Sequence, residues 1–412
     1  MIIGNCNAQE NDEQGSRFID VKTYVQLVLE NNKTLYAEKY EIKIADANLE
    51  LLKPIPDPEF AISGFDNQEH HLKMGQGYNA SLEWLMETGG KRKVRKELAK
   101  TGQQLALQNL NNEMRLFKAA AKTLFYETVL AEENLQVSWN SYHIIKELAR
   151  MDSLRYLKGS ASKMEALQSK LESEIRWNEC MEKQAVRDVL LQEMVTLAGL
   201  DTNTELKRPL ISSPQFLLPF NLDQAIAQAL EKRSDFKFSQ LKHKESNQEL
   251  QHTKAERATD ITWSIEHTFN TESRNDIGET PQFRTTALGV QIPLKFSNFN
   301  KAALKIGTAQ IAQSQILENQ VKLEITAEVK NAFVRYENAQ KRMQQLDDHF
   351  LQEARQILDA KKYSYQRGED SLMEVLFVQN TYNEMQQLFN ETKYNLIQSQ
   401  INLEKAIQIP LF

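Results

Sequence analysis

Residues 156–167 read YLKGSASKMEAL, and residues 365–376 read YQRGEDSLMEVL. Both stretches follow the pattern Y-x-x-G-x-x-S-x-M-E-x-L. Identical residues precede them at nearly the same spacing: Leu85, Phe125 and Ala131 before the first, and Leu294, Phe333 and Ala339 before the second. A pattern that recurs together with its surroundings indicates an internal duplication. The chain therefore contains two copies of one structural unit.

A glycine lies near the centre of each repeated stretch. Gly159 and Gly368 lack a Cβ atom, so they can adopt the positive φ angle that ends a helix. The helix that follows can be capped by Ser162 in one copy and by Ser371 in the other. Because long segments with helical periodicity flank each glycine, each copy is predicted to contain a long helical hairpin.

Both repeats are expected to have the same order of elements, namely a helix, a strand hairpin and a long helical hairpin. In the first repeat, residues 18–200, these are a helix over about 18–54 that breaks at Asn31 and Asn32, strands over 59–65 and 78–85 joined by a loop over 66–77 in a hairpin of about 59–86, and a helical hairpin over about 91–199 with helices 91–157 and 162–199. In the second repeat, residues 221–408, they are a helix over about 222–259, strands over 261–271 and 285–294 in a hairpin of about 261–295, and a helical hairpin over about 301–407 with helices 301–365 and 371–407. A linker with three prolines, residues 201–220, joins the repeats.

Residues 1–17 are interpreted as the remnant of a signal peptide followed by a polar tail. Cys6, Asn7 and Ala8 resemble a small-x-Ala cleavage site before a polar stretch. The basic start and most of the apolar segment are missing, so we expect the printed numbering to begin inside the signal peptide. Lipidation of Cys6 is the alternative, although Asn5 is a poor residue before a lipidation cysteine.

The composition narrows the function classes. With 14 glycines in 412 residues and a mean hydropathy of -0.56, the chain suits long helices with much surface in water. It has no apolar run near 20 residues, so a membrane-spanning helix is not expected, whereas membrane strands remain compatible with the sequence. The net charge of -6 gives no basic footprint for a nucleic-acid partner.

The sequence contains no catalytic or metal-binding motif. Its seven histidines lack the spacing of metal ligands, and Cys180 lies in a helical segment where a lone thiol is an inert packing residue. A phosphate-binding glycine loop and a nucleophile motif are also missing. We therefore expect neither an enzyme nor a cofactor.

The four predicted strands each have one apolar face. These faces contain Leu82 and Trp84 in the first hairpin, and Trp263, Ile265, Phe269, Val290 and Ile292 in the second. In an exported chain, such strands are typical of a transmembrane barrel, which must close so that every backbone group is paired. Four strands cannot close alone, whereas three chains would supply about twelve strands.

The doubled tip stretch, the paired long helices, the strand hairpin in each half and the linker resemble the TolC-type outer-membrane efflux duct family over about residues 18–408. Residues 87–92, ETGGKR, are similar to the heavy-metal, Czc-like branch. The resemblance implies a mainly α fold with a small β part: an α-barrel of long helical hairpins and a trimeric, twelve-stranded β-barrel to which each chain gives four strands. It also implies a passive exit duct in the outer membrane and periplasm, with a periplasmic adaptor and an inner-membrane pump as partners.

The same resemblance assigns roles to residues at the tip. Glu165 and Glu374 would narrow the pore, where six carboxylates in a trimer would raise some pKa values and attract cations; the alternative is two ordinary glutamates at helix N-termini. Tyr156 and Tyr365 would hold neighbouring helices closed, or would be half-buried aromatics. Asp370 stands where the family can place an arginine, and Phe377 replaces a second acid, so the arginine latch of the family is in doubt. The exposed turns would dock the adaptor through Gly159, Ser160, Gly368 and Glu369.

A cluster of basic residues opens the helix after the first strand hairpin: Lys91, Arg92, Lys93, Arg95 and Lys96. Cations at a helix N-terminus oppose the helix dipole, so an anion should offset them. Phospholipid head groups at the inner edge of the outer membrane are one hypothesis, and a solvated or ion-paired collar is the other.

A soluble coiled-coil scaffold or periplasmic adaptor would account equally well for the long helices. It would not need apolar faces on short alternating strands, and an adaptor should carry a compact β domain that the sequence does not show. The efflux duct is therefore the favoured function. Residues 87–92 favour metal cations as the exported substrate.

Overall fold

The computed structural model describes residues 18–52, 55–69, 72–206, 208–209, 221–294, 301–346 and 348–409. The proposed signal remnant and most of the linker therefore lie outside the described residues. The chain divides into two compact units. The tip unit comprises Met1–Glu38, Leu110–Ser234 and Lys322–Phe412, and the sheet unit comprises Lys39–Asn109 and Asp235–Val321. Each unit contains residues from both repeats.

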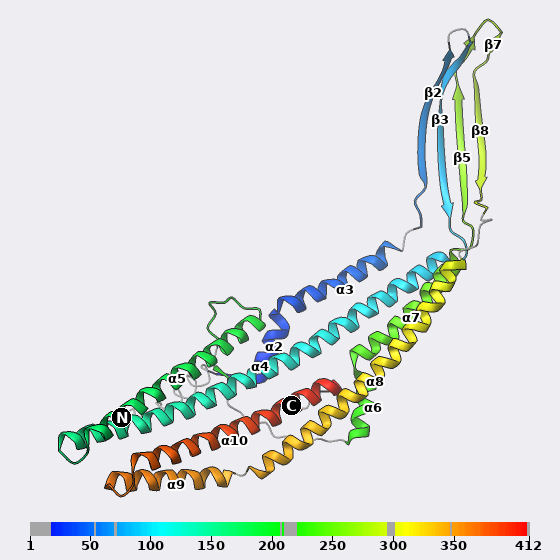
Figure 1. Cartoon of the computed structure of the whole chain (residues 1–412). Helices are drawn as coiled ribbons and strands as arrows, with labels where there is room; N and C mark the ends of the chain where they lie inside the picture. The colour runs from blue at the N-terminus through cyan, green and yellow to red at the C-terminus, as the bar shows by residue number, and fades with distance from the viewer. Residues whose placement is uncertain are drawn as a thin grey trace, which may run out of the picture. The chain divides into compact units, whose positions relative to one another are not determined.

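The tip unit is built from long helices (Figure 1). Its elements are β1 (Phe18–Ile19), α2 (Val21–Asn31), most of α4 (Lys91–Leu157), α5 (Lys163–Leu197), β4 (Arg208–Pro209), α6 (Leu222–Lys232), the second half of α8 (Lys301–Gln345), α9 (Asp348–Arg367) and α10 (Leu372–Ile407). The helices α4 and α5 form one hairpin, and α9 and α10 form the other. The strand β1 pairs in parallel with β4, so the linker is anchored beside the start of the first repeat.

The core of the tip unit lies where α2, α4, α5 and α10 meet. Tyr24, Phe125, Met194 and Ile401 are fully buried there. The Tyr24 hydroxyl donates a hydrogen bond to the Met194 carbonyl at 3.1 Å, and burial raises the pKa of this tyrosine. A buried tyrosine with a satisfied hydroxyl contributes a large apolar ring without leaving a polar group unpaired.

Polar pairs hold α10 antiparallel to α4. From one end to the other they are Ser141 with Asn383 at 3.0 Å, Asn134 with Asn390 at 3.2 Å, Glu133 with Lys393 at 2.9 Å and Lys122 with Glu404 at 2.7 Å. As the position falls along α4, its partner rises along α10. The two hairpins of the tip unit are therefore joined by side-chain hydrogen bonds as well as by apolar packing.

The sheet unit contains one antiparallel sheet and the helices that lead into it. The sheet has the strand order β2 (Glu59–Glu69), β3 (Leu72–Met86), β5 (Ile261–Asn270) and β8 (Phe283–Gln291). Its helices are α3 (Lys33–Leu51), α7 (Ser234–Ala255) and the first parts of α4 and α8, and a short hairpin, β6 (Ser273–Arg274) with β7 (Glu279–Thr280), lies beyond β5. The strands β2 and β8 are the two edges of the sheet.

The predicted fold class, mainly α with a small β part, is confirmed. The predicted break at Asn31 and Asn32 is also present, between α2 and α3. It arises because the Asn32 side chain accepts hydrogen bonds from the backbone of Thr34 and Leu35 and donates one to the Leu197 carbonyl at 2.8 Å. An asparagine that bonds to the backbone in this way starts a new helix.

The predicted loop over residues 66–77 is wrong, because β2 and β3 extend to Glu69 and from Leu72. The glycines suggested a loop, but they serve a close approach within the sheet. A Cβ atom on Gly77 would overlap the Phe269 carbonyl oxygen of β5. Glycine in a strand often marks such a contact.

Three predicted helix limits also differ from the structure. Phe18 and Ile19 form β1 and not the start of a helix. The predicted helix over 222–259 divides between α6 and α7 because Arg233 is extended and its guanidinium donates to the Ala406 carbonyl and to Glu328. The predicted helix over 301–365 divides into α8 and α9. The sequence there has Asp347 and Asp348, and aspartate disfavours helix interiors.

Within the described residues, none of the helices combines the length and the apolar character that crossing a bilayer would require.

Candidate functional site

The register of the sheet places the large apolar side chains on one face. Trp84 pairs with Trp263, which in turn pairs with Val290. Two residues away from Trp84 on the same face, Leu82 pairs with Ile265, and further along the strands Tyr78 pairs with Phe269. The two tryptophans are 51% and 49% exposed, so this apolar face is uncovered in the chain. Ile292, predicted on the same face, lies one residue beyond β8 and is also exposed.

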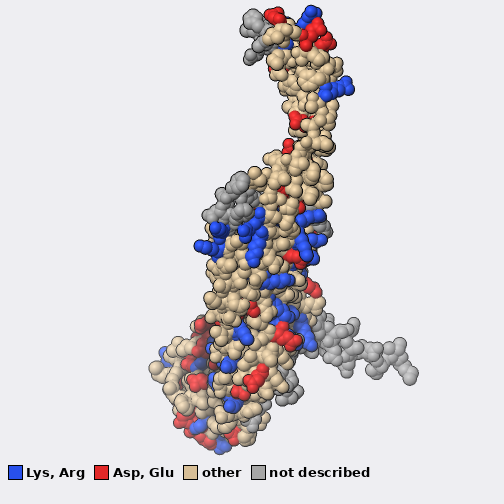
Figure 2. Space-filling view, turned by 90° about the vertical axis from the view of Figure 1, so that its right-hand side faces the viewer, with Lys and Arg blue, Asp and Glu red and all other residues tan. Residues whose placement is uncertain are grey.

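The opposite face of the sheet is polar. On it the Asn79 amide donates to the Glu266 carboxylate at 2.6 Å. Figure 2 shows few charged side chains along the visible side of the sheet, except at the end that carries the loops between strands. Alternation along each strand therefore separates an exposed apolar face from a polar one, as the period of two predicted.

The two repeated glycines form the tip turns. Gly159 has φ 73° and Gly368 has φ 82°, which are left-handed values that favour glycine. Ser162 caps α5 in a capping box with Glu165, and the Ser371 side chain caps α10. The predicted turns and caps are thus present. The residues assigned to adaptor docking, Gly159, Ser160, Gly368 and Glu369, are all exposed at these turns.

The two repeated tyrosines have different environments. The Tyr365 hydroxyl donates to both carboxylate oxygens of Asp152 at 2.8 Å, joining α9 to α4. Arg155 lies 3.9 Å from the Asp152 carboxylate and over the Tyr365 ring, 5.8 Å from its centroid. Tyr156 is 43% exposed, and its hydroxyl makes no hydrogen bond with the described residues. One tyrosine therefore holds two helices together within the chain, and the other does not.

The acids assigned to the pore each have a hydrogen-bond or ion-pair partner within the chain. The Ser162 backbone N–H and hydroxyl hold the pKa of Glu165 below its usual value. Lys361 contacts Asp370 at 2.9 Å and Glu374 at 3.1 Å. Its ammonium lowers the pKa of Asp370, and the two acids raise the pKa of Lys361. Within one chain the pKa of Glu165 is thus lowered, whereas repulsion around a pore would raise some of these values.

Two contributors to the tip could not be found from the sequence pattern. Asp152 is 213 positions from Tyr365, and Lys361 is 13 positions before Glu374, across the turn. Neither spacing places side chains on one helix face. In this chain a lysine, Lys361, and not an arginine binds Asp370.

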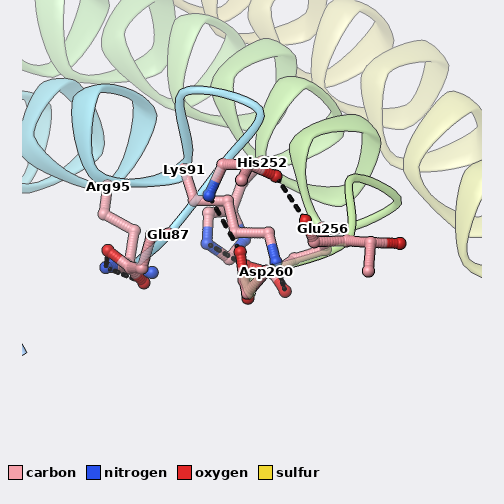
Figure 3. A network of polar contacts seen from close by, with 8 residues as sticks. Glu87, Lys91, Arg95, His252, Glu256 and Asp260 are labelled. Atoms are coloured by element: carbon pink, nitrogen blue, oxygen red, sulfur yellow. Dashed lines mark hydrogen bonds and ion pairs between the residues drawn. The ribbon is translucent and has the colours of Figure 1, made fainter. Parts of the chain in front are cut away.

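The basic cluster at the start of α4 contains an ion-paired group and an exposed group, and Figure 3 shows the ion-paired one. Lys91 is 3% exposed, and its ammonium contacts Asp260 at 2.7 Å and Glu256 at 3.6 Å. Burial lowers the pKa of Lys91, but the hydrogen bond to Asp260 and the charge of Glu256 outweigh it, so the net change is upward. Arg95 binds the Glu87 carboxylate at 2.6 Å. These two cations form an ion-paired collar, whereas Arg92, Lys93 and Lys96 are exposed.

The described residues contain no group of three or more His, Cys, Asp or Glu side chains that could hold a metal ion.

Comparisons with known proteins agree with this architecture. The CusC protein, whose structures concern folding and transmembrane channel formation, has 16% identity and a TM-score of 0.75, covering 95% of this chain and 93% of that chain. The CmeC outer membrane channel of Campylobacter jejuni has 16% identity and a TM-score of 0.75, with 94% and 85% covered. The open MtrE outer membrane channel of Neisseria gonorrhoeae has 14% identity and a TM-score of 0.71, with 95% and 89% covered.

At these low sequence identities, the similarity to the solved structures shows a shared fold. A comparison with curated proteins finds no match. In a comparison with family models, however, the second repeat does match. Residues 225–407 of this chain match the Outer membrane efflux protein family, and nearly the whole chain has the fold of solved outer-membrane channels.

Proposed function

We propose that this chain is the outer-membrane channel of a tripartite efflux system. It acts as a homotrimer and provides a passive exit duct across the periplasm and the outer membrane. An inner-membrane pump and a periplasmic adaptor deliver its substrates. The family match over residues 225–407 and the fold shared with solved outer-membrane channels support an efflux channel.

The observation that carries the proposal is the sheet. It exposes an apolar face and has two edge strands, β2 and β8, whose outer backbone groups have no partner strand among the described residues. In a bilayer such edges must be paired, and a closed barrel is the arrangement that pairs them. Three chains of four strands give twelve strands, with β8 of one chain beside β2 of the next.

The duplication indicates which edge residues should face each other. Residues 57–62, DPEFAI, align with residues 260–265, DITWSI, so Ile62 corresponds to Ile265. Val290 occupies on β8 the place that Leu82 has on β3, two residues before an apolar side chain of the same face. Since Leu82 pairs with Ile265 inside the chain, Val290 should pair with Ile62 of a neighbouring chain.

The experiment introduces Ile62→Cys and Val290→Cys together in a full-length chain with Cys6→Ser and Cys180→Ser. Oxidation of the outer-membrane fraction should give disulfide-linked species up to a covalent trimer on a non-reducing gel. Each single cysteine variant is the control, because it can form no covalent trimer. A freely soluble monomer without cross-linked species would overturn the proposal and favour the scaffold function.

The tip supplies the finer part of the proposal. Glu165 and Glu374 narrow the inner end of the duct, Tyr156 and Tyr365 take part in its closure together with Asp370, and the turns at Gly159, Ser160, Gly368 and Glu369 dock the adaptor. The exposure of both turns supports the docking role. Copurification of the adaptor with a chain carrying Ser160→Trp and Glu369→Trp tests it, since unchanged recovery would remove the turns from the interface.

The exposed part of the basic cluster is proposed to bind phospholipid head groups. Arg92, Lys93 and Lys96 are proposed for this role because they are the exposed members of the cluster, and Lys91 and Arg95 form ion pairs with acids of the chain. Each basic side chain near an anionic surface contributes about 1 kcal/mol to membrane binding. Replacing the three by glutamine should slow trimer assembly on anionic vesicles and change it little on zwitterionic ones, as measured by gel.

The same charge change on α5, with glutamine at the exposed Lys163, Lys170 and Lys183, is the matched control. Equal assembly rates for the two triple variants on anionic vesicles would show that the basic cluster has no lipid role.

Metal cations are the proposed substrate, on the similarity of residues 87–92 to the heavy-metal branch. In this structure Thr88 and Glu87 contact other residues of the sheet unit. The support for metal export is therefore the sequence resemblance alone. Growth of a deletion strain with and without the gene, on metal salts and on drugs, decides the point. Complementation of drug sensitivity without complementation of metal sensitivity would contradict metal cargo.

A further inference from the structure

The contact between Lys91 and Asp260 joins two connections that come from different repeats. Asp260 lies just before β5 and accepts hydrogen bonds from the Thr88 backbone N–H at 2.9 Å and from the Lys91 ammonium at 2.7 Å. Thr88 and Lys91 belong to the connection from β3 into α4. The end of one hairpin is thus fixed to the start of the other by a junction of one acid and one lysine (Figure 3). We refer to Lys91 and Asp260 as the junction pair.

The duplication contains the two halves of a second junction pair. Asp57 aligns with Asp260, and it lies two residues before β2 as Asp260 lies one residue before β5. Lys301 is the first residue of α8, as Lys91 is the first residue of α4. Both side chains are exposed, and within the described residues neither makes an ion pair. Each half is therefore present without the contact that its counterpart makes.

Strand order explains why the second pair is not formed within the chain. The first pair forms because β3 and β5 are neighbours, with Met86 at the end of one opposite Ile261 at the start of the other. Asp57 precedes β2 and Lys301 follows β8, and these strands are the opposite edges of the sheet. In an antiparallel sheet of this order, β8 of one copy runs antiparallel to β2 of the next. The end of β8 then lies beside the start of β2.

The positive charge of Lys301 at the start of α8 also favours a contact with Asp57 of another chain. A lysine at the first position of a helix opposes the helix dipole and needs a nearby anion. For Lys91 that anion is Asp260 at 2.7 Å, and the contact lets the Lys91 side chain be only 3% exposed. Lys301 occupies the equivalent first position of α8, and it has no such partner among the described residues.

We propose that Asp57 of one subunit pairs with Lys301 of the next subunit, so that each boundary between chains repeats the junction pair found within a chain. This inference rests on the proposed trimer and specifies one of its contacts. The partner is a second copy of this chain. A ring of three chains then has six equivalent junctions, three within chains and three between them, and each sets the start of a long helix against the start of a strand.

A disulfide experiment tests the proximity. A full-length chain with Asp57→Cys and Lys301→Cys, in the Cys6→Ser and Cys180→Ser background, should form covalent dimers and trimers on oxidation of the membrane fraction. A cross-link confined to the monomer, or none, overturns the inference. The Ile62→Cys and Val290→Cys chain is run beside it. Trimers from that chain without trimers from this one reject the junction and leave the channel proposal standing.

A charge exchange tests the interaction itself. Asp57→Lys should lower the temperature at which trimers dissociate in detergent, because it places two cations at each boundary. Adding Lys301→Asp should restore the parent temperature by reversing the pair. Asp57→Lys with Lys305→Asp is the matched control, because Lys305 is exposed one turn further along α8. Equal recovery in both double variants would show a general charge effect and overturn the pairing.

Discussion

Replacing Tyr365 by phenylalanine should open the tip of the assembled channel. The change removes the hydroxyl that donates to both oxygens of Asp152, whose side chain is 1% exposed. A hydrogen bond to a charged group contributes about 1.5–3 kcal/mol, and its loss leaves a buried carboxylate with fewer donors. If the bond is made only while α9 lies against α4, the ratio of open to closed tips should rise by about 10- to 150-fold.

The measurement is single-channel conductance in planar bilayers, where the variant should spend more time in its high-conductance state. Burial and the bond to Asp152 raise the pKa of Tyr365, so its hydroxyl stays protonated at neutral pH and this donor is present in the parent protein. Tyr363→Phe is the matched control on the same helix, because Tyr363 is 61% exposed and its hydroxyl has no hydrogen bond among the described residues. Equal conductance in the two variants would contradict the role of the Tyr365 contact.

The contrast between the two repeated tyrosines, Tyr156 and Tyr365, shows which structural features a duplicated sequence can predict. Local features followed from it, because a helix end and its cap depend on residues within one turn. Gly159 and Gly368 have the expected positive φ, and Ser162 and Ser371 cap as expected. Tyr156 and Tyr365 occupy equivalent positions in the repeat, yet their surroundings differ. The difference depends on which face of α4 meets α9, and a pattern within one repeat does not contain that information.

The sheet was predictable to a similar degree. Alternation correctly placed Trp84 and Trp263 on one face, since side-chain direction in a strand depends only on position. Strand length was not predictable from composition. Gly77 has the sequence appearance of a loop residue, but its lack of a Cβ allows contact with β5. The reason for a glycine becomes visible only when the neighbouring strand is known.

The basic cluster shows an intermediate case. The helix dipole correctly indicated that cations at the start of α4 need an anion. It did not indicate which one, because Asp260 is 169 positions from Lys91 and belongs to the other repeat. Pairing of β3 with β5 brings them together. A physical anomaly in the sequence therefore marked the place of a contact, and the topology of the sheet supplied its partner.

Breaking the contact between Lys91 and Asp260 from one side should destabilise the sheet unit. Asp260→Ala removes the acceptor for Lys91 and for the Thr88 backbone N–H, and it leaves an ammonium that is 3% exposed with Glu256 at 3.6 Å. Removing one partner of a fully buried pair costs about 3–5 kcal/mol, since the remaining charge stays out of water. We expect a cost at or below the lower end of this range, because Asp260 is 24% exposed and Glu256 remains near the ammonium. We therefore expect a lower thermal midpoint of the strand signal in circular dichroism of the full chain.

The double variant Lys91→Met and Asp260→Ala tests whether the single variant loses stability because a charge is left buried or because the turn changes shape. Replacing both partners of a buried pair by apolar side chains is often close to neutral, so the double variant should recover most of the stability that Asp260→Ala loses. Lys93→Met is the control, because Lys93 is exposed on the first turn of the same helix and should change the midpoint little. If the single and double variants were equally unstable, the loss would come from the Thr88 hydrogen bond and the shape of the turn. The charge of Lys91 would then not be the feature that makes Asp260 necessary.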